Sequence, residues 1–319
     1  MKAMQSLLRT FNILAIALLC TLHTRVSAEA RPLDTTVNAD GSVDKEKDYS
    51  KSYTLAAGDQ VSIHNSFGKV DVHTWDKNEV KVDVHIKVTS TTEEEATYVL
   101  DRIHIEDSKD GSLVRYRTNL DLDDHDGRHH NRKFSIDYTV YLPSTQTLDL
   151  ENSFGATTLP DYAGPLDVTS KFGSLDAGRL GSVKSLRVEF GKAKVASISG
   201  GEVVIKYSKA DLLEVSGQID ADFQFCDVMD LGVVSGIKGL KIKNAYTQLH
   251  LKLATGIPAH FDISTHFGSL NNRSDYPIKE EEDQDGKHRD MFRKTYSGKS
   301  GDGTVDVILT DEFATVDIS

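Results

Sequence analysis

A six-residue phrase recurs through the middle of the chain, and its regular spacing constrains the fold more than any other feature. The phrase holds an aromatic residue, a small residue, any residue, an apolar residue, any residue and a second apolar residue. Its copies, the first three being the clearest, begin at Phe154, Phe172, Phe190, Tyr207, Phe225, Tyr246 and Phe267. The aromatic positions step by 18, 18, 17, 18, 21 and 21 residues. Such a fixed period is typical of proteins in which one small unit stacks on copies of itself, because no single unit can bury its own apolar face.

Each period also holds a second alternating segment, such as residues 186–190 and 203–207. Alternation with a period of two is typical of strands, since successive side chains point to opposite faces. Two short strands and two turns per period predict an all-β fold, a β-solenoid or β-helix of 18–21-residue repeats. We expect the glycine after each aromatic at a tight corner, through positive φ or close approach of the next coil. We interpret the aromatics as a structural ladder inside the coil or along its edge, in preference to a ligand site.

Residues 51–150 predict a strand-rich cap that includes a first copy of the phrase at Phe67. One short helix is expected after Thr92, which can cap it, with Glu95 completing a capping box. Residues 103–116 predict a hairpin around Asp110-Gly111. Terminal coils of repeat proteins need a cap of this kind.

The two ends of the chain have different patterns. Residues 1–28 combine Lys2 and Arg9, an apolar core over 13–20 and small residues over 26–28, which predicts a secretory signal peptide. Residues 29–50 are polar and are expected to form a flexible leader. The repeats are expected over 151–319, with a charged insertion at 271–303 from which the chain returns for a terminal coil at Phe313.

Charge and cysteine content restrict the partners. Loss of the signal, with Lys2, Arg9 and Arg25, takes the formal net charge from −12 to −15. So acidic a chain should repel nucleic acid and anionic membrane surfaces. Cys226 would be the only cysteine of the mature chain, and it replaces the glycine of the phrase, so we expect a small buried residue in a corner. No membrane-spanning stretch follows the signal.

One segment carries candidate metal ligands. They are Asp123, Asp126, His125, His129 and His130. Imidazole and carboxylate ligands suit zinc or a similar ion, but the spacing does not match a calcium loop and no fourth partner is evident. Residues 281–292 fail the calcium pattern as well, because Phe292 stands where a glutamate is needed. We favour a solvated hairpin tip and expect neither metal nor cofactor.

The sequence nominates no catalytic residue. The outward positions of the repeats vary and include Asp176, Asp211, Gln248 and His250, without a repeated carboxylate pair. A track of Lys192, Lys194 and Lys209 is the nearest feature to a binding surface, and solvated faces usually look like this. No nucleophile elbow, phosphate loop or metalloprotease motif is present.

Residues 65–82, from Asn-Ser-Phe-Gly-Lys-Val to Glu-Val-Lys-Val, resemble the opening of the bacterial putative-adhesin family. The resemblance extends through the repeats and covers most of 51–319. It implies a β-solenoid head region behind a signal peptide, in secreted or cell-envelope proteins of unknown function. It supplies no catalytic or binding residues.

These observations favour an exported, non-catalytic cell-envelope or surface protein, an adhesin by family resemblance. Such a protein would be periplasmic, surface-bound or secreted, and would present a repetitive face to an unknown protein or glycan. One alternative is a periplasmic accessory protein in envelope-stress signalling. Another is a polysaccharide-active β-helix enzyme, a lyase or a hydrolase.

Overall fold

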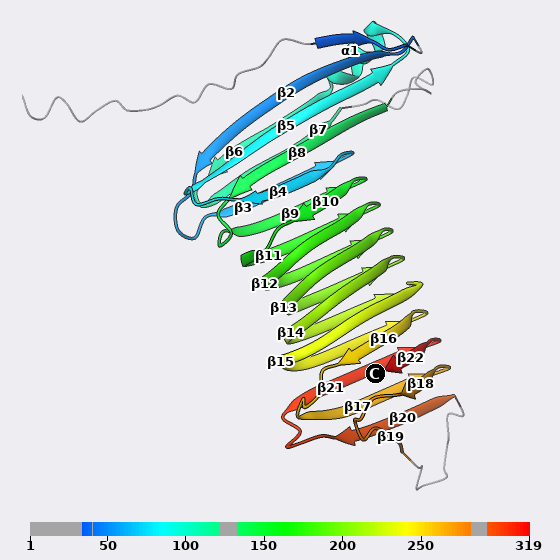
Figure 1. Cartoon of the computed structure of the whole chain (residues 1–319). Coiled ribbons are helices and arrows are strands. Elements are labelled where there is room, and N and C mark those ends of the chain that lie inside the picture. Colours follow the sequence, from blue (N-terminus) through cyan, green and yellow to red (C-terminus); the bar gives the residue numbers. More distant parts are fainter. Residues whose placement is uncertain (1–33, 40, 122–132, 282–291) are drawn as a thin grey trace, which may run out of the picture.

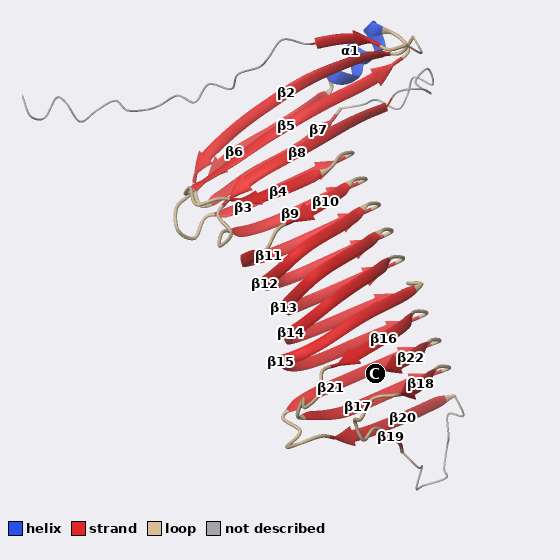
Figure 2. Cartoon of the chain, in the orientation of Figure 1, coloured by secondary structure: helices blue, strands red, loops and turns tan. Residues whose placement is uncertain are grey.

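The computed structural model describes residues 34–39, 41–121, 133–281 and 292–319 (Figure 1). Within these ranges the chain forms one mixed sheet of 22 strands and one helix, α1 (Glu93–Leu100), so the predicted β class is confirmed (Figure 2). The strands are β1 (Asp34–Val37), β2 (Val43–Thr54), β3 (Gln60–Ser66), β4 (Val70–Thr74), β5 (Glu79–Ser90), β6 (Ile103–Asp110), β7 (Leu113–Leu120), β8 (Lys133–Leu142), β9 (Thr147–Ser153), β10 (Ala156–Leu159), β11 (Tyr162–Lys171), β12 (Ser174–Glu189), β13 (Lys192–Lys206), β14 (Lys209–Gln224), β15 (Val228–Ala245), β16 (Gln248–Leu253), β17 (Ala259–His266), β18 (Ser269–Asn272), β19 (Lys279–Glu280), β20 (Arg293–Lys299), β21 (Val305–Glu312) and β22 (Thr315–Ile318).

The N-terminal part is an antiparallel sheet, β1–β2–β5–β8, with the β6–β7 hairpin beside β3. The helix and hairpin lie where the sequence predicts them. Thr92 caps α1, since its side chain accepts a hydrogen bond from the Glu95 amide at 3.2 Å. The helix buries Ala96, Val99 and Leu100, and it contacts β2 and β5.

The expected flexible leader is wrong in part, because β2 already begins at Val43. It pairs with β5 along its whole length, from Val43↔Ser90 to Thr54↔Glu79. A polar segment can form such a strand because its backbone hydrogen bonds come from the neighbouring strand, while its polar side chains stay in contact with water on one face.

Two rows of parallel strands make up the middle of the molecule. One row runs β4–β10–β12–β13–β14–β15–β16 and the other β3–β9–β11–β12–β13–β14–β15. The long strands β12 to β15 belong to both rows, with their first residues in one and their last residues in the other. Apolar residues such as Leu175 and Val188 point inward from the two rows and are buried between them.

Each aromatic residue of the phrase sits in a tight turn, and the aromatic itself takes positive φ. The described chain has nine non-glycine residues with φ from +50° to +65°, and all nine are these aromatics: Phe67, Phe154, Phe172, Phe190, Tyr207, Phe225, Tyr246, Phe267 and Phe313. The following glycine serves close approach instead. A Cβ on Gly173 would lie 1.9 Å from the Gly155 carbonyl oxygen. The expectation of close approach is therefore confirmed, and that of positive φ belongs one residue earlier.

The nine rings form a continuous ladder along the outer edge of the stack. Neighbouring centroids are 4.8–5.1 Å apart and the ring planes differ by 1–5°. Left-handed φ costs a non-glycine residue about 1–2 kcal/mol, and each ring pair returns about 0.5–1.5 kcal/mol. Because the nine strained residues share eight ring pairs, stacking offsets part of the backbone strain.

The C-terminal strands depart from chain order. The sequence predicts that the chain returns after the insertion to form the terminal coil. Instead β21 pairs with both β15 and β17, and β22 pairs with both β16 and β18. The returning segment therefore lies between two earlier layers, and the antiparallel strand β20 covers β17 beyond it (Figure 1). The local sequence pattern cannot reveal this placement, because any segment with the same alternation could pair between these two layers.

The returning segment carries a carboxyl group into the core. Asp311 is fully buried and accepts a hydrogen bond from Asn244 Nδ2 at 2.6 Å. Its other oxygen, Oδ2, has no hydrogen-bond partner in the described part of the chain, and the same holds for Thr265 Oγ1 in the next layer. Burial raises the pKa of Asp311 to about 6.

This burial predicts a pH-dependent stability difference between the wild type and Asp311→Asn. The folded pKa lies above the unfolded value of 3.8, so the contribution of Asp311 to stability falls as pH rises from about 4 to about 6. The variant lacks this loss. Its stability relative to the wild type should rise by roughly 2 kcal/mol between pH 4 and pH 8. Urea unfolding at both pH values measures this, and a pH-independent difference would contradict it.

The strained turns predict that Phe190→Gly is more stable than Phe190→Ala, the reverse of the usual order in strands. Phe190→Ala removes two stacking contacts but keeps a Cβ in left-handed backbone, whereas Phe190→Gly also removes the strain. We expect the alanine variant to lose roughly 1–3 kcal/mol and the glycine variant about 1 kcal/mol less. Exposed Ile308, in the regularly paired strand β21, is the control, and there alanine should be more stable than glycine. If denaturant unfolding showed the alanine variant to be the more stable one at both sites, the strain at Phe190 would be refuted.

Candidate functional site

The aromatic ladder is the largest exposed apolar feature of the described chain. Its rings are 36–50% exposed. Their faces are covered by the neighbouring rings, so a ligand would meet a continuous row of ring edges. Contiguous exposed apolar surface of this kind marks interaction sites more often than scattered apolar residues do.

In two of the turns the amide that follows the ladder aromatic donates a hydrogen bond to a side chain of the next layer. Gly191 N donates to Ser208 Oγ at 3.0 Å, and Cys226 N donates to Thr247 Oγ1 at 3.0 Å. The corresponding residues after Gly155 and Gly173 are themselves glycines, Gly173 and Gly191, and have no side chain. Neither the Gly155 nor the Gly173 amide has a hydrogen-bond partner among the described residues.

Cys226 lies in one of these turns, as the sequence predicts. It is buried, and its sulfur contacts the Ile205 carbonyl oxygen at 3.4 Å. Burial raises the pKa of its thiol, and a hydrogen bond from the Ser208 amide works against that rise. The thiol is therefore a packing group of the turn.

An open groove of about 520 Å³ runs over the turns that hold the unpaired amides. It is lined by the ladder residues Phe172, Phe190 and Tyr207, by the glycines Gly155, Gly173 and Gly191, and by Ala156, Ser174 and Lys192. We call it the glycine groove. It combines backbone donors with apolar ring edges in one place.

Two lysines flank this groove in adjacent strands. Lys192 lines it, and Lys192 pairs in register with Lys209 across β13 and β14. Both are exposed, and neither forms an ion pair within the described ranges. Like charges directly opposite each other destabilise a sheet. The third lysine of the predicted track, Lys194, lies instead between Asp176 and Asp211.

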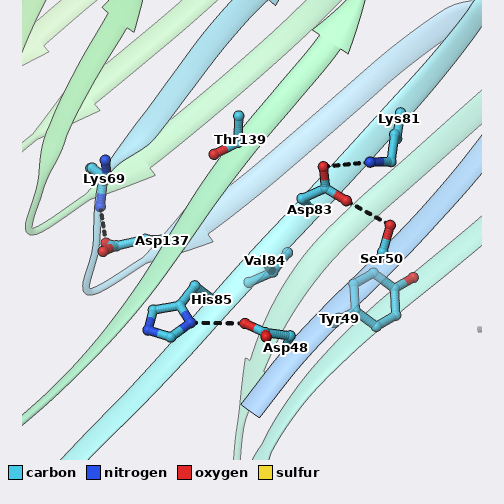
Figure 3. Close-up of a pocket in the computed structure, with 10 residues that line it drawn as sticks. All are labelled: Asp48, Tyr49, Ser50, Lys69, Lys81, Asp83, Val84, His85, Asp137 and Thr139. Atoms are coloured by element: carbon cyan, nitrogen blue, oxygen red, sulfur yellow. Dashed lines mark hydrogen bonds and ion pairs between the residues drawn. The ribbon is translucent and has the colours of Figure 1, made fainter. Parts of the chain in front are cut away.

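A second hollow, of about 610 Å³, lies on the N-terminal sheet over β2, β5 and β8 (Figure 3). Its polar groups bond to one another. Ser50 Oγ donates to Asp83 Oδ1 at 2.6 Å, Lys81 Nζ donates to Asp83 Oδ2 at 2.7 Å, and His85 Nδ1 lies 2.8 Å from Asp48 Oδ1.

This internal pairing limits what the hollow can do. The Ser50 hydroxyl bonds to Asp83 and not to His85, so these residues form no nucleophile–base pair. The Lys69 ammonium pairs with Asp71 at 2.8 Å, which raises the pKa of Lys69. A polar ligand would have to break such contacts before making its own.

Ser62, His64 and Asp149 cluster on the other row of strands. Ser62 Oγ and Asp149 Oδ2 both approach the same ring nitrogen, His64 Nε2, at 3.2 and 3.3 Å. A serine relay needs the hydroxyl on one ring nitrogen and the carboxylate on the other. The arrangement instead lowers the pKa of Asp149 through its bond to His64.

The predicted metal ligands Asp123, His125, Asp126, His129 and His130 lie outside the described residues. Elsewhere in the described chain, no cluster of three or more His, Cys, Asp or Glu residues is arranged to hold a metal ion. The described ranges also contain no helix that is both long and apolar enough to span a membrane.

The structure brings together acidic groups that the sequence leaves apart. Asp211 pairs in register with Asp230, and His250 Nδ1 lies 3.2 Å from Asp230 Oδ1. Asp211 is the fourth residue after its ladder aromatic but Asp230 is the fifth, because the turn after Phe225 is one residue longer. Aligning the copies with this extra residue would have revealed the pair.

No protein-family model and no curated protein matches the chain. Solved structures do match it. One is a putative cell adhesion protein from Clostridium sporogenes, 10% identical, with 86% of this chain and 99% of that chain covered and a TM-score of 0.25. Putative adhesins from Bacteroides fragilis (9% identical, 86% and 97% covered, TM-score 0.32) and Parabacteroides merdae (12%, 85% and 96%, 0.29) also match. These names agree with the family resemblance of residues 65–82.

Proposed function

We propose that the chain is an exported, non-catalytic cell-envelope or surface protein whose repeats wind as a β-solenoid and present one edge for binding. The parallel register supports the solenoid. Ser174 pairs with Lys192 and Lys192 pairs with Lys209, so equivalent residues of successive periods lie side by side. Tight aromatic turns join the two rows on one edge, as they would in successive coils.

The binding role depends mainly on one observation, the exposed aromatic ladder. Nine half-exposed rings form an unbroken strip, and strained backbone holds each ring in place. The strip stays rigid because every ring stacks on its neighbours, so a partner would lose little conformational entropy from this surface on binding. Many weak contacts along such a strip would add up through multivalency.

The polar clusters support a non-catalytic role. In the hollow of Figure 3 and at His64 the candidate acids and bases pair with each other, in geometries that do not align a nucleophile with a base. Export is supported by the signal-peptide pattern of residues 1–28.

Surface location can be tested with a single introduced cysteine. Lys279 is exposed in β19, and Cys226 is buried, so Lys279→Cys creates one accessible thiol in the mature chain. We expect a membrane-impermeant maleimide to label this variant on intact producing cells and to leave the wild-type chain unlabelled. A cytoplasmic protein with an exposed cysteine controls for leakage.

Labelling of Lys279→Cys only after lysis would contradict surface exposure. That outcome would favour the periplasmic alternative, an accessory protein that binds another envelope protein.

A further inference from the structure

We propose that the glycine groove binds an acidic glycan, through its unpaired backbone amides and through Lys192 and Lys209. This inference names the ligand of the proposed binding role and rests on it. Within the described residues the groove offers donors, cations and apolar edges side by side. A matching ligand must be rich in acceptors, negatively charged and apolar on part of its surface.

The chain itself indicates what the unpaired amides accept. In two equivalent turns an aliphatic hydroxyl oxygen, Ser208 Oγ or Thr247 Oγ1, takes the hydrogen bond at 3.0 Å. Gly155 and Gly173 line the groove, and their amides have no hydrogen-bond partner among the described residues. Hydroxyl oxygens of a sugar chain would complete the pattern, and they recur along a polymer as the amides recur along the stack.

The lysine pair supplies the charge preference. Lys192 and Lys209 stand opposite each other without a carboxylate partner in the described chain, in a protein whose net charge is −12. Such a pair weakens the sheet unless an anion lies between the two ammonium groups. A carboxylate or sulfate on the glycan would remove this repulsion.

The bordering rings complete the recognition. Phe172, Phe190 and Tyr207 turn their edges toward solvent and are 47–50% exposed. The C–H surfaces of sugar rings can pack against these edges while the sugar hydroxyls face the amides. The hollow on the N-terminal sheet lacks this combination, because its polar groups already pair with each other.

The test measures binding of the full chain to three polymers by calorimetry at low salt. Polygalacturonate carries hydroxyls and carboxylates, dextran carries hydroxyls alone, and polyglutamate carries carboxylates alone. We expect polygalacturonate to bind at least tenfold more tightly than either of the others. Equal affinity for polyglutamate would overturn the hydroxyl requirement, and equal affinity for dextran would overturn the role of the lysines.

Two double variants separate a site from general electrostatics. Lys192→Gln with Lys209→Gln should weaken polygalacturonate binding roughly tenfold or more, the effect of losing about one charge-assisted hydrogen bond. Lys241→Gln with Lys243→Gln removes the same charge from exposed positions of the other row in β15 and should change affinity less than twofold. Equal losses in both variants would overturn the proposal. Unfolding curves of both variants show that the fold is intact.

Selective ¹⁵N-glycine labelling then locates the contact. On addition of polygalacturonate the Gly155 and Gly173 amide resonances should shift most. Gly191, whose amide is already bonded to Ser208, and the distant Gly256 should shift less. Uniform or absent shifts at a saturating concentration would overturn the placement. If the polymers fail to bind while Lys279→Cys is labelled on intact cells, the ligand assignment falls and the surface role stands.

Discussion

The distance between parallel strands is the constraint on which the structure depends. Strands in a sheet lie about 4.7–4.9 Å apart, and each turn must repeat at that spacing. The aromatic rings meet it with centroids 4.8–5.1 Å apart, and they do so by taking left-handed backbone. The strained turn and the ring stack therefore belong together. The stack offsets part of the strain, and the left-handed backbone aims every ring at its neighbour.

The same spacing explains the glycine after each aromatic. With layers this close, the residue after Phe172 approaches the carbonyl of the layer before it so tightly that a Cβ would collide. Where serine, cysteine or threonine stands there instead, its side chain lies against the neighbouring turn and occupies an amide. The glycine groove lies where several glycines follow one another in the stack, at Gly155, Gly173 and Gly191, and a comparable hollow lies over the turns at Cys226, Thr247 and Ala314.

Much of this architecture can be predicted from the sequence, because period and alternation are local properties. The step between Phe154 and Phe172 predicts the neighbouring turns, and the stripe after Thr92 predicts the helix. The strand over residues 43–50 cannot be found this way, since a polar segment becomes a strand only through β5. The position of β21 cannot be predicted from the sequence either, because it depends on which layers are left with an unpaired edge. The unpaired amides of the groove require knowledge of the stacking order, which composition does not contain.

The position of the returning segment has a consequence for how the chain matures. Layer β17–β18 is joined to the layers before it through β21 and β22, so it cannot be fastened to them until residues 305–318 pair. The layers before β17 can pair in chain order without residues 305–318. During that interval β15 and β16 present open edges, and unpaired edges are where strands from other chains can add. Strands β21 and β22 thus cover both edges, and a chain cut short before Val305 would leave the edges of β15 and β16 unpaired.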